Sequence, residues 1–512
     1  MSDISERKGM KEDKIKHLSK LLTGSEVLLF VTGFGLGVAA LIQQSSSLFL
    51  SSICLLFTCN ILVALNNLRS RFLFIVFLIS LFTFLIGRPL FGIINGIEGW
   101  MGSGQQEENI IFSFFLVFLT LLFLPIGAVA MDYFITGKRW GQTKNTDRKV
   151  NTRMLANLQA VTLITFYITC IFYFIVQIEP LVFMQDKNYI QYYKDFQSQL
   201  PGIVHTIASF MKYALCLFLA TMPSKKRAFF PLALFAVSAV PMLIIGVRNP
   251  IMLNCLFIVV YYSLRDIKGC AKKWIGRFEK ICLAVAVPGS LVFMSVYAFI
   301  RSDAPLVSFN PFVYLGQFFY GQGVTFNVLQ IGYGYRKGIE LLGNHYTFGG
   351  MIDYIKHGTL GQLIFGTDPL PAGNCDINGI HSNNLSHNLS YITMRKDYLS
   401  GRGRGSSYLL ETYFDFGYIG VILFSLLLGA LLVLMVHKFG KNVLGSTIIL
   451  VSLTTIYFIP RAEATGWLTF IITIQFWACC LACYVGAFIC TKVGWLQNLF
   501  VRLRLSPRIE ND

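Results

Sequence analysis

The chain has 512 residues, of which 54% are hydrophobic and only 13% are charged, and its formal net charge is +17. Soluble domains carry about 25% charged residues, so this composition excludes a large soluble domain and indicates a polytopic membrane protein. The basic residues are spread over many short segments, which excludes a compact nucleic-acid-binding face.

Twelve apolar segments fit the usual length rule for membrane-spanning helices, about 20 residues each. They cover residues 26–42, 48–66, 72–92, 110–132, 156–177, 203–221, 229–247, 250–264, 281–300, 417–436, 444–460 and 465–490. We therefore predict an all-α, polytopic integral membrane protein with about twelve transmembrane helices. The hydrophilic start is too long for a secretory n-region and no cleavage site follows it, so the first apolar segment is expected to be retained.

The connections between these segments divide into two sets when they are assigned alternately to the two sides of the membrane. One set contains both termini and 29 of the 43 Lys and Arg residues. The positive-inside rule assigns this set to the cytoplasm. Both termini are therefore expected to be cytoplasmic, and the basic segments are expected to lie against anionic lipid headgroups.

The opposite side receives one very long connection. We expect a cytoplasmic tail at 1–25, nine spans in 26–300, a long periplasmic loop at 301–415, three spans in 416–491 and a cytoplasmic tail at 492–512. The loop is rich in Tyr, Phe and Gly, and connections of this length are usually functional or disordered. Residues 346–366 (YTFGGMIDYIKHGTLGQLIFG) predict an amphipathic helix lying in the membrane interface, and residues 309–321 (FNPFVYLGQFFYG) are expected to dip into it.

Four arginines lie at or near the predicted outer ends of spans: Arg88, Arg248, Arg301 and Arg461. Charges next to the membrane are usually tolerated where they face a polar cavity or a ligand, and a guanidinium matches two phosphate oxygens at once. A lipid-anchored phosphate or pyrophosphate would suit these arginines, whereas snorkelling to headgroups is the alternative for each. For Arg461, the neighbouring Glu463 favours a local ion pair. Arg248 lies in GVRNP, at the tip of a tight hairpin, where a functional role is favoured.

The end of the long loop, GRGRGSSYLLETYFDFGY (401–418), combines glycines, Arg402 and Arg404 just before the tenth span. Glycines let the backbone approach a ligand closely, and a helix N-terminus flanked by arginines favours an anion. Ser406 or Ser407 is expected to cap the following helix. Glu411 is one residue too far from Ser407 for a capping box, so an ordinary cap explains it only through the helix dipole.

If the helix starts at Ser407, then Ser407, Glu411 and Asp415 share one face. His381 and His387 precede this stretch at a spacing that is not typical of a metal site, and no carboxylate cluster accompanies them. An acid, base or hydrogen-bond role is the functional interpretation of His387, and a solvated loop residue is the alternative. Neither a metal nor a cofactor is predicted.

The stretch from His387-Asn-Leu-Ser-Tyr391 to Gly401–Gly420 resembles the O-antigen polysaccharide polymerases of the Wzy type. The hairpin Gly246–Pro250, the twelve-span plan and the long outer loop also resemble that family. The resemblance implies a GT-C-like, lipid-linked glycosyltransferase architecture. It also implies that undecaprenyl-pyrophosphate-linked oligosaccharide repeat units are joined at the periplasmic face of a bacterial inner membrane, with release of undecaprenyl pyrophosphate. A Wzz-type chain-length regulator and a flippase would be partners in the same membrane.

Within that chemistry, the leaving pyrophosphate needs cations and the attacking hydroxyl needs a base. We assign Glu411, then His387, as the base. The candidates for binding the pyrophosphate are Arg248, Arg301, Arg402, Arg404 and Arg88. The candidates for stacking on sugars are Tyr391, Tyr398 and Tyr408.

Two other functions remain open at this point. An O-antigen ligase shares the spans and the outer loop, but would transfer finished polymer to lipid A–core. A glycolipid flippase or transporter would predict mid-span charges and paired broken helices. Lys212 is the clear mid-span charge, and the prolines of the spans give no paired pattern.

Overall fold

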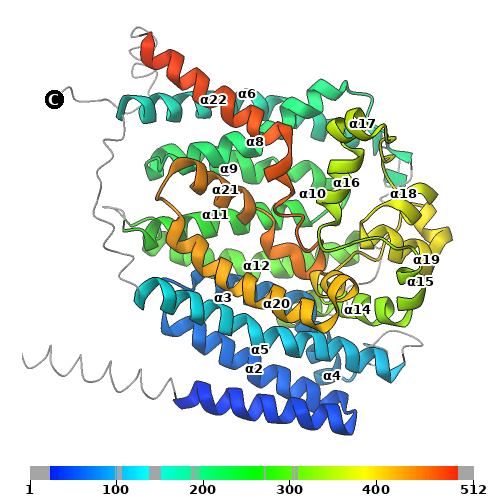
Figure 1. Cartoon of the computed structure of the whole chain (residues 1–512). Helices are drawn as coiled ribbons and strands as arrows, with labels where there is room; N and C mark the ends of the chain where they lie inside the picture. Colours follow the sequence, from blue (N-terminus) through cyan, green and yellow to red (C-terminus); the bar gives the residue numbers. More distant parts are fainter. Residues whose placement is uncertain are drawn as a thin grey trace, which may run out of the picture. The chain divides into compact units, whose positions relative to one another are not determined.

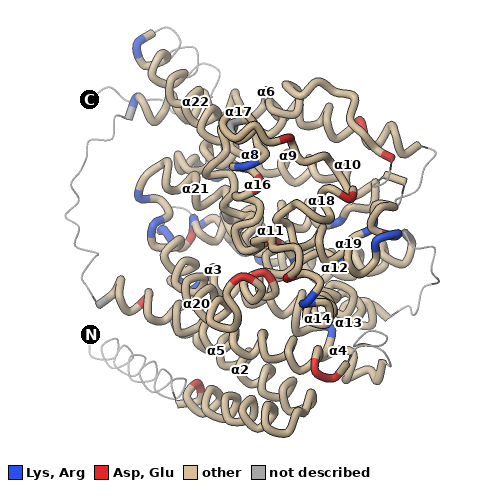
Figure 2. The backbone as a smooth tube through the Cα atoms, turned by 45° about the vertical axis from the view of Figure 1, so that its right-hand side comes forward, with Lys and Arg blue, Asp and Glu red and all other residues tan. Residues whose placement is uncertain are grey.

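The computed structural model describes residues 24–97, 100, 106–137, 152–185, 191–192, 195–269, 273–301, 305 and 310–493 (Figure 1). All regular elements in these ranges are helical, which confirms the predicted all-α class. Most of the described residues are uncharged, and the Lys, Arg, Asp and Glu residues lie in short segments of the chain (Figure 2).

Twelve of the helices are long and apolar enough to cross a membrane, as predicted. They are Gly24–Gln43, Ser46–Asn66, Phe72–Ile94, Glu107–Thr136, Arg153–Phe183, Gly202–Ala220, Lys225–Ile245, Asn249–Ile267, Arg277–Ile300, Tyr408–Lys438, Val443–Arg461 and Ile474–Lys492. The chain is thus a multi-pass membrane protein.

Two boundaries differ from the prediction. The tenth span begins at Tyr408 rather than 417, so the last part of the predicted loop is helical. The twelfth begins at Ile474 rather than 465, because the apolar residues before it include the 3₁₀ turn η4 (Thr469–Ile472) instead of continuing the α-helix. At these two places, apolar composition alone did not predict where the helix begins.

The chain forms two compact units. Unit 1 comprises Met1–Arg139, Gly316–Lys337 and Ser406–His437. Unit 2 comprises Trp140–Leu315, Gly338–Gly405 and Lys438–Asp512.

Unit 1 is built on two parallel helices that pack closely, α5 and α20. Its helices after Gly24–Gln43 are α2 (Ser46–Asn66), α3 (Phe72–Leu81), the π-helix η1 (Phe82–Ile86), α4 (Gly87–Ile94), α5 (Glu107–Gly137), α14 (Thr325–Gly334) and α20 (Tyr408–Lys438). A Cβ on Gly127 of α5 would lie 2.0 Å from the carbonyl oxygen of Leu426, and one on Gly429 of α20 would lie 2.1 Å from that of Leu124. Glycine is therefore required where the two backbones meet.

Unit 2 contains the remaining described helices. These are α6 (Thr152–Phe183), α8 (Gly202–Ala220), α9 (Lys225–Val237), α10 (Val240–Ile245), α11 (Asn249–Ile267), α12 (Arg277–Arg301), α16 (Gly349–His357), α17 (Thr359–Phe365), α18 (Asp376–His381), α19 (Leu385–Leu399), α21 (Val443–Leu453), η3 (Ile456–Arg461), η4 (Thr469–Ile472) and α22 (Ile474–Lys492). The short helices α13 (Pro311–Gln322) and α15 (Arg336–Glu340) cross the boundaries between the units. Helices α6, α8 and α22 pack on one another.

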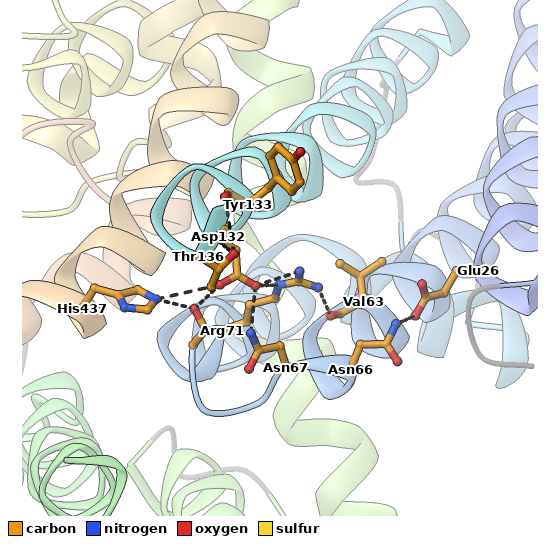
Figure 3. A network of polar contacts seen from close by, with 10 residues as sticks. Glu26, Val63, Asn66, Asn67, Arg71, Asp132, Tyr133, Thr136 and His437 are labelled. Carbon is orange, nitrogen blue, oxygen red and sulfur yellow. Dashed lines mark hydrogen bonds and ion pairs between the residues drawn. The ribbon is translucent and has the colours of Figure 1, made fainter. Parts of the chain in front are cut away.

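One end of unit 1 is held by a polar network around Asp132 of α5 (Figure 3). Its carboxylate accepts hydrogen bonds from Asn67 (3.0 Å) and Ser70 (2.6 Å) and pairs with Arg71 at 2.9 Å. His437 Nε2, at the end of α20, lies 2.7 Å from Ser70 Oγ and 3.8 Å from Asp132 Oδ1. The connection 67–71 and His437, which the charge pattern assigned to one side of the membrane, thus lie at the same end of unit 1.

Replacing Asp132 with Asn is expected to lower the stability of the protein by about 3–5 kcal/mol, because it leaves the largely buried Arg71 without its charged partner. Thermal unfolding in detergent would measure the loss. Glu26→Gln is the matched control, since Glu26 is a nearby acid that accepts a hydrogen bond from Asn66, which glutamine can also accept (Figure 3). Equal shifts of Tm for the two variants would contradict this role of Asp132.

Candidate functional site

The predicted long loop folds into helices in its described part. The amphipathic segment 346–366 forms two helices, α16 and α17, instead of one. The break falls at Gly358, where a Cβ would lie 2.3 Å from the carbonyl oxygen of Tyr354. The segment 309–321 contains most of α13. That these helices lie in the membrane interface stays a prediction.

Helix α19 carries His387, and Asn384 caps its N-terminus by accepting a hydrogen bond from the backbone N–H of Ser386. His387 Nδ1 lies 2.7 Å from the hydroxyl of Tyr398, one ring meeting the other edge-on. Burial lowers the pKa of His387, while the negative charge of Asp353 acts to raise it. The imidazole is therefore predominantly neutral near pH 7, which is the form that accepts a proton.

Arg402 and Arg404 both lie against α19. The backbone N–H of Arg404 donates to Ser390 Oγ (2.9 Å), and its Nε donates to Thr393 Oγ1 (2.7 Å). Arg402 is exposed and pairs with Asp397 at 3.4 Å. Gly401 and Gly405 adopt positive φ, +94° and +83°, which explains two of the three glycines of this motif. The structure thus brings His387 and both loop arginines to one helix of unit 2.

Tyr391 also belongs to α19, and its ring packs on Gly379, where a Cβ would lie 2.5 Å from the ring. Its hydroxyl donates to Asp376 (2.9 Å), which also pairs with Arg395 (2.7 Å). By contrast, the predicted sugar-stacking residue Tyr398 is only 1% exposed. Its ring is covered, and its hydroxyl lies 2.7 Å from His387 Nδ1.

The structure also reveals a carboxylate pair that the sequence interpretation missed, Asp353 and Glu463. Asp353 accepts hydrogen bonds from Ser382 (2.8 Å) and from both the backbone and side-chain nitrogens of Asn383. Glu463 accepts a hydrogen bond from Asn384 at 2.7 Å. Burial, and then the negative charge of Asp353, raise the pKa of Glu463. The two acids are 110 residues apart in the sequence, so no local pattern connects them.

Glu463→Gln is expected to raise the melting temperature near pH 7. Because the folded state raises the pKa of this carboxyl, its contribution to stability is complete below the ordinary value of 4.5 and is lost as pH rises through the raised pKa. Glutamine stays neutral and still accepts the hydrogen bond from Asn384. The gain in Tm should therefore shrink toward pH 4.5, and a variant with a lower Tm than the wild type at pH 7 would contradict the argument.

Arg248 occupies the predicted hairpin between two spans. Helix α10 ends at Ile245, Gly246 adopts φ +107°, and α11 begins at Asn249. The Arg248 Nη1 donates to the carbonyl oxygen of Met294 in α12 at 2.8 Å, and the side chain is half-buried. Arg301 is the last residue of α12, and its side chain lies outside the described part of the structure.

Glu411 lies in the first turn of α20, in unit 1, and is fully buried. The expected cap is not formed in the usual way, since Ser407 Oγ is buried without a hydrogen-bond partner. Instead the hydroxyl of Ser406 donates to Glu411 Oε1 at 2.6 Å. Asp415 is half-buried two residues before Gly417, whose φ of +63° interrupts the helix. Glu411 therefore has a local hydrogen-bond partner that the capping-box argument did not anticipate.

The structure does not support the predicted sugar-stacking role of Tyr408. The sequence proposed it as a sugar-stacking residue, but its side chain is fully buried. Its ring packs against Phe77 and Phe424, with centroids 6.3 and 5.3 Å away. The aromatic ring belongs to the core of unit 1, because the helix starts early enough to turn it inward.

Arg88 lies in α4, directly after the π-helix η1. Its Nε donates to the carbonyl oxygen of Trp100 (3.0 Å) and its Nη1 to that of Tyr320 (3.3 Å), while the guanidinium covers the Tyr320 ring at 4.3 Å. Short π-helices occur often at functional sites. Here the arginine is held by carbonyls and an aromatic ring.

Within the described ranges, no group of three or more His, Cys, Asp or Glu side chains is arranged to hold a metal. The described cysteines are free thiols, so the structure contains no disulfide among them.

Residues 25–493 match the family model described as O-antigen polysaccharide polymerase Wzy. No curated protein and no solved structure matches the chain. The family match therefore spans nearly all of the described residues, and the GT-C-like architecture stays a prediction.

Proposed function

Because the chain belongs to the O-antigen polysaccharide polymerase family Wzy, we propose that it joins undecaprenyl-pyrophosphate-linked oligosaccharide repeat units into a surface polysaccharide. The family match over residues 25–493 is the observation that carries this proposal. The reaction would take place at the periplasmic face of the bacterial inner membrane, with both termini cytoplasmic. A Wzz-type chain-length regulator and a flippase would work beside it.

In the proposed reaction, a hydroxyl of the incoming repeat unit attacks the anomeric carbon of the growing chain. The bond from that carbon to the pyrophosphate oxygen breaks, and its electron pair leaves with undecaprenyl pyrophosphate. The proton of the hydroxyl passes to a base on the protein. No metal ion, nucleotide sugar or other cofactor is needed for this balance.

The arginines would stabilise the charge that develops on the leaving pyrophosphate. Arg248, Arg402 and Arg404 lie on unit 2 at or near the surface, which supports this role for them. Arg301 and Arg88 are proposed as further contacts. Tyr391, whose hydroxyl is fixed by Asp376, is proposed to stack on a sugar.

Glu411 is proposed as the base, with His387 second. The neutral state of His387 supports its candidacy, because a neutral imidazole accepts a proton. Glu411 is fully buried beside Ser406, so its action requires the acceptor hydroxyl to enter next to that serine.

Deletion of the gene tests the function directly. We expect the surface polysaccharide to change from long chains to a single repeat unit attached to lipid A–core. Lipid-linked polymer that accumulates without attachment would instead identify a ligase. Lipid-linked units confined to the cytoplasmic leaflet would identify a flippase.

A further inference from the structure

Glu463 lies between the last two membrane-crossing helices, Val443–Arg461 and Ile474–Lys492, in a turn that packs on the long loop of unit 2. Thr465 Oγ1 in this turn donates a hydrogen bond to the carbonyl oxygen of Thr347 at 2.6 Å, just before α16. The charge pattern predicts that both connections lie on the outer side of the membrane. The turn is therefore part of the same surface region of unit 2 as the segment that leads into α16.

The two oxygens of the Glu463 carboxylate have different surroundings. Oε1 accepts a hydrogen bond at 2.7 Å from the side chain of Asn384, the cap residue of α19. Among the residues that the structure describes, none donates to Oε2, and this oxygen remains open to solvent. One half of the carboxylate is thus fixed by the protein, while the other half can accept a hydrogen bond from a ligand.

Two glycines keep Oε2 uncovered. A Cβ on Gly350 of α16 would lie 2.8 Å from Oε2, and a Cβ on Gly466 would lie 3.1 Å from it. Gly466 is exposed, so a ligand can approach from its side. A Cβ on Gly350 would also lie 3.5 Å from Thr469 Oγ1, which is buried without a hydrogen-bond partner. The described protein therefore leaves two side-chain oxygens unpaired beside Gly350.

The acid is retained although it lowers the stability of the protein. Burial, and then the negative charge of Asp353, raise the pKa of Glu463, so its ionised form destabilises the folded state near pH 7. The hydrogen bond from Asn384 does not require an acid, because glutamine would also accept it. Residues that lower stability are commonly kept where activity needs them. The open oxygen is the part of Glu463 that glutamine would not reproduce.

The same surface carries an exposed aromatic side chain. Phe348, which follows Thr347 and lies two residues before Gly350, is 48% exposed. A sugar presents hydroxyl donors and apolar C–H faces, which a carboxylate oxygen and an aromatic ring match. The backbone N–H of His387 donates to the carbonyl oxygen of Asn384 at 3.1 Å, in the first turn of α19. The Glu463 carboxylate is thus connected to the helix turn that carries a candidate base.

We propose that Glu463 Oε2 accepts a hydrogen bond from a hydroxyl group of a sugar in the glycan substrate. The proposal rests on the proposed function and adds a substrate-binding residue on unit 2. Because Asn384 holds Oε1, the carboxylate orients the sugar without taking part in bond making or breaking. Its loss therefore affects KM rather than kcat.

Glu463→Gln tests this role, because glutamine still accepts the hydrogen bond from Asn384 but places an NH₂ donor where Oε2 accepts. The probe is the lipid-linked single repeat unit that accumulates in a strain lacking this gene. With purified protein in detergent, we expect KM for this unit to rise about tenfold, because a substrate hydroxyl loses its charged acceptor. We expect little change in kcat. The Tm near pH 7 is expected to rise, so that loss of the fold does not account for the change in KM.

Gly466→Ala is the second variant, because it keeps the carboxylate and adds a methyl group 3.1 Å from Oε2. We expect KM to rise about tenfold here too, since the methyl group covers the oxygen. This variant decides the question if Glu463→Gln does not fold. Gly338→Ala is its control, because a Cβ at that position would meet the side chain of Ile392 at 3.4 Å, on the middle of α19. Its KM is expected to stay at the wild-type value.

Glu179→Gln is the matched control for the acid. Glu179, near the end of α6, is also half-buried in unit 2, but both of its oxygens accept hydrogen bonds within the protein. The donors are the backbone N–H of Gln199, at 2.6 Å, and the hydroxyl of Ser198. Its KM is expected to stay at the wild-type value, because no oxygen is left for a ligand.

Two results would overturn the proposal. A wild-type KM in a folded Glu463→Gln variant, or in Gly466→Ala if the first does not fold, would mean that Glu463 only orients the cap residue Asn384. An equal rise of KM in the control variants would mean that any change in this region disturbs the substrate site. Failure of the proposed function has a different outcome, since the wild-type protein itself would then not polymerise the lipid-linked unit.

Discussion

Glu411→Gln is expected to reduce polymerisation by about 10²–10⁴-fold while the protein still folds. Glutamine keeps an oxygen that accepts the hydrogen bond from Ser406, so the first turn of α20 remains intact. What it loses is the ability to take the proton of the attacking hydroxyl. The measurement is kcat for lipid-linked repeat units with purified protein, together with Tm. The loss is expected in kcat, because the base acts in the transition state.

Asp415→Asn is the control for this prediction, because Asp415 is an acid on the same helix one turn further on and is half-buried. Its kcat is expected to stay close to that of the wild type. An active Glu411→Gln variant would contradict the role of Glu411 as base. In that case His387, which is neutral and half-buried in unit 2, would be the residue to replace.

Arg248→Ala is expected to reduce kcat by about 10²–10³-fold, because a guanidinium aimed at the leaving pyrophosphate stabilises charge that develops in the transition state. Arg248→Lys should recover part of the rate. Lysine supplies the charge but not the planar pair of donors that matches two phosphate oxygens. Polymer length on a gel and single-turnover rates with lipid-linked units measure both variants.

The bond from Arg248 to the carbonyl oxygen of Met294 gives this residue a structural role as well. Arg227→Ala separates the two roles, since Arg227 is also partly buried and donates to Gln159 at 2.9 Å near the opposite end of its span. We expect Arg227→Ala to lower Tm without a large change in kcat. If Arg248→Ala lost stability and activity in the same proportion as this control, the catalytic role would be refuted.

Several features were predictable from local sequence. The hairpin at Arg248 follows from Gly246 and Pro250, and the structure confirms it with a left-handed glycine followed by a new helix. The need for glycine in GRGRG was also predictable, since two of its three glycines, Gly401 and Gly405, adopt positive φ. These features depend on the conformational limits of a few consecutive residues.

Other features could not be predicted from the local sequence. Tyr408 was assigned to a sugar because it lies in a polar motif, yet it packs in the core of unit 1. For Glu463 the sequence suggested only Arg461, two residues away, and the hydrogen bond from Asn384, 79 residues away, was not predicted. That its second oxygen has no donor among the described residues gave no sequence signal at all, because whether a polar group finds a partner depends on neighbours from other helices.

The sequence by itself determined the membrane class, the twelve spans and the motif that resembles the polymerase family, because hydrophobic length and turn chemistry are local properties. Only the tertiary structure decided which side chains are buried and which distant residues meet. It paired Asp353 with the 382–383 turn, placed Glu463 beside Asn384, and held Glu411 against Ser406. Such pairings follow from helix packing, which brings together residues that no sequence period connects.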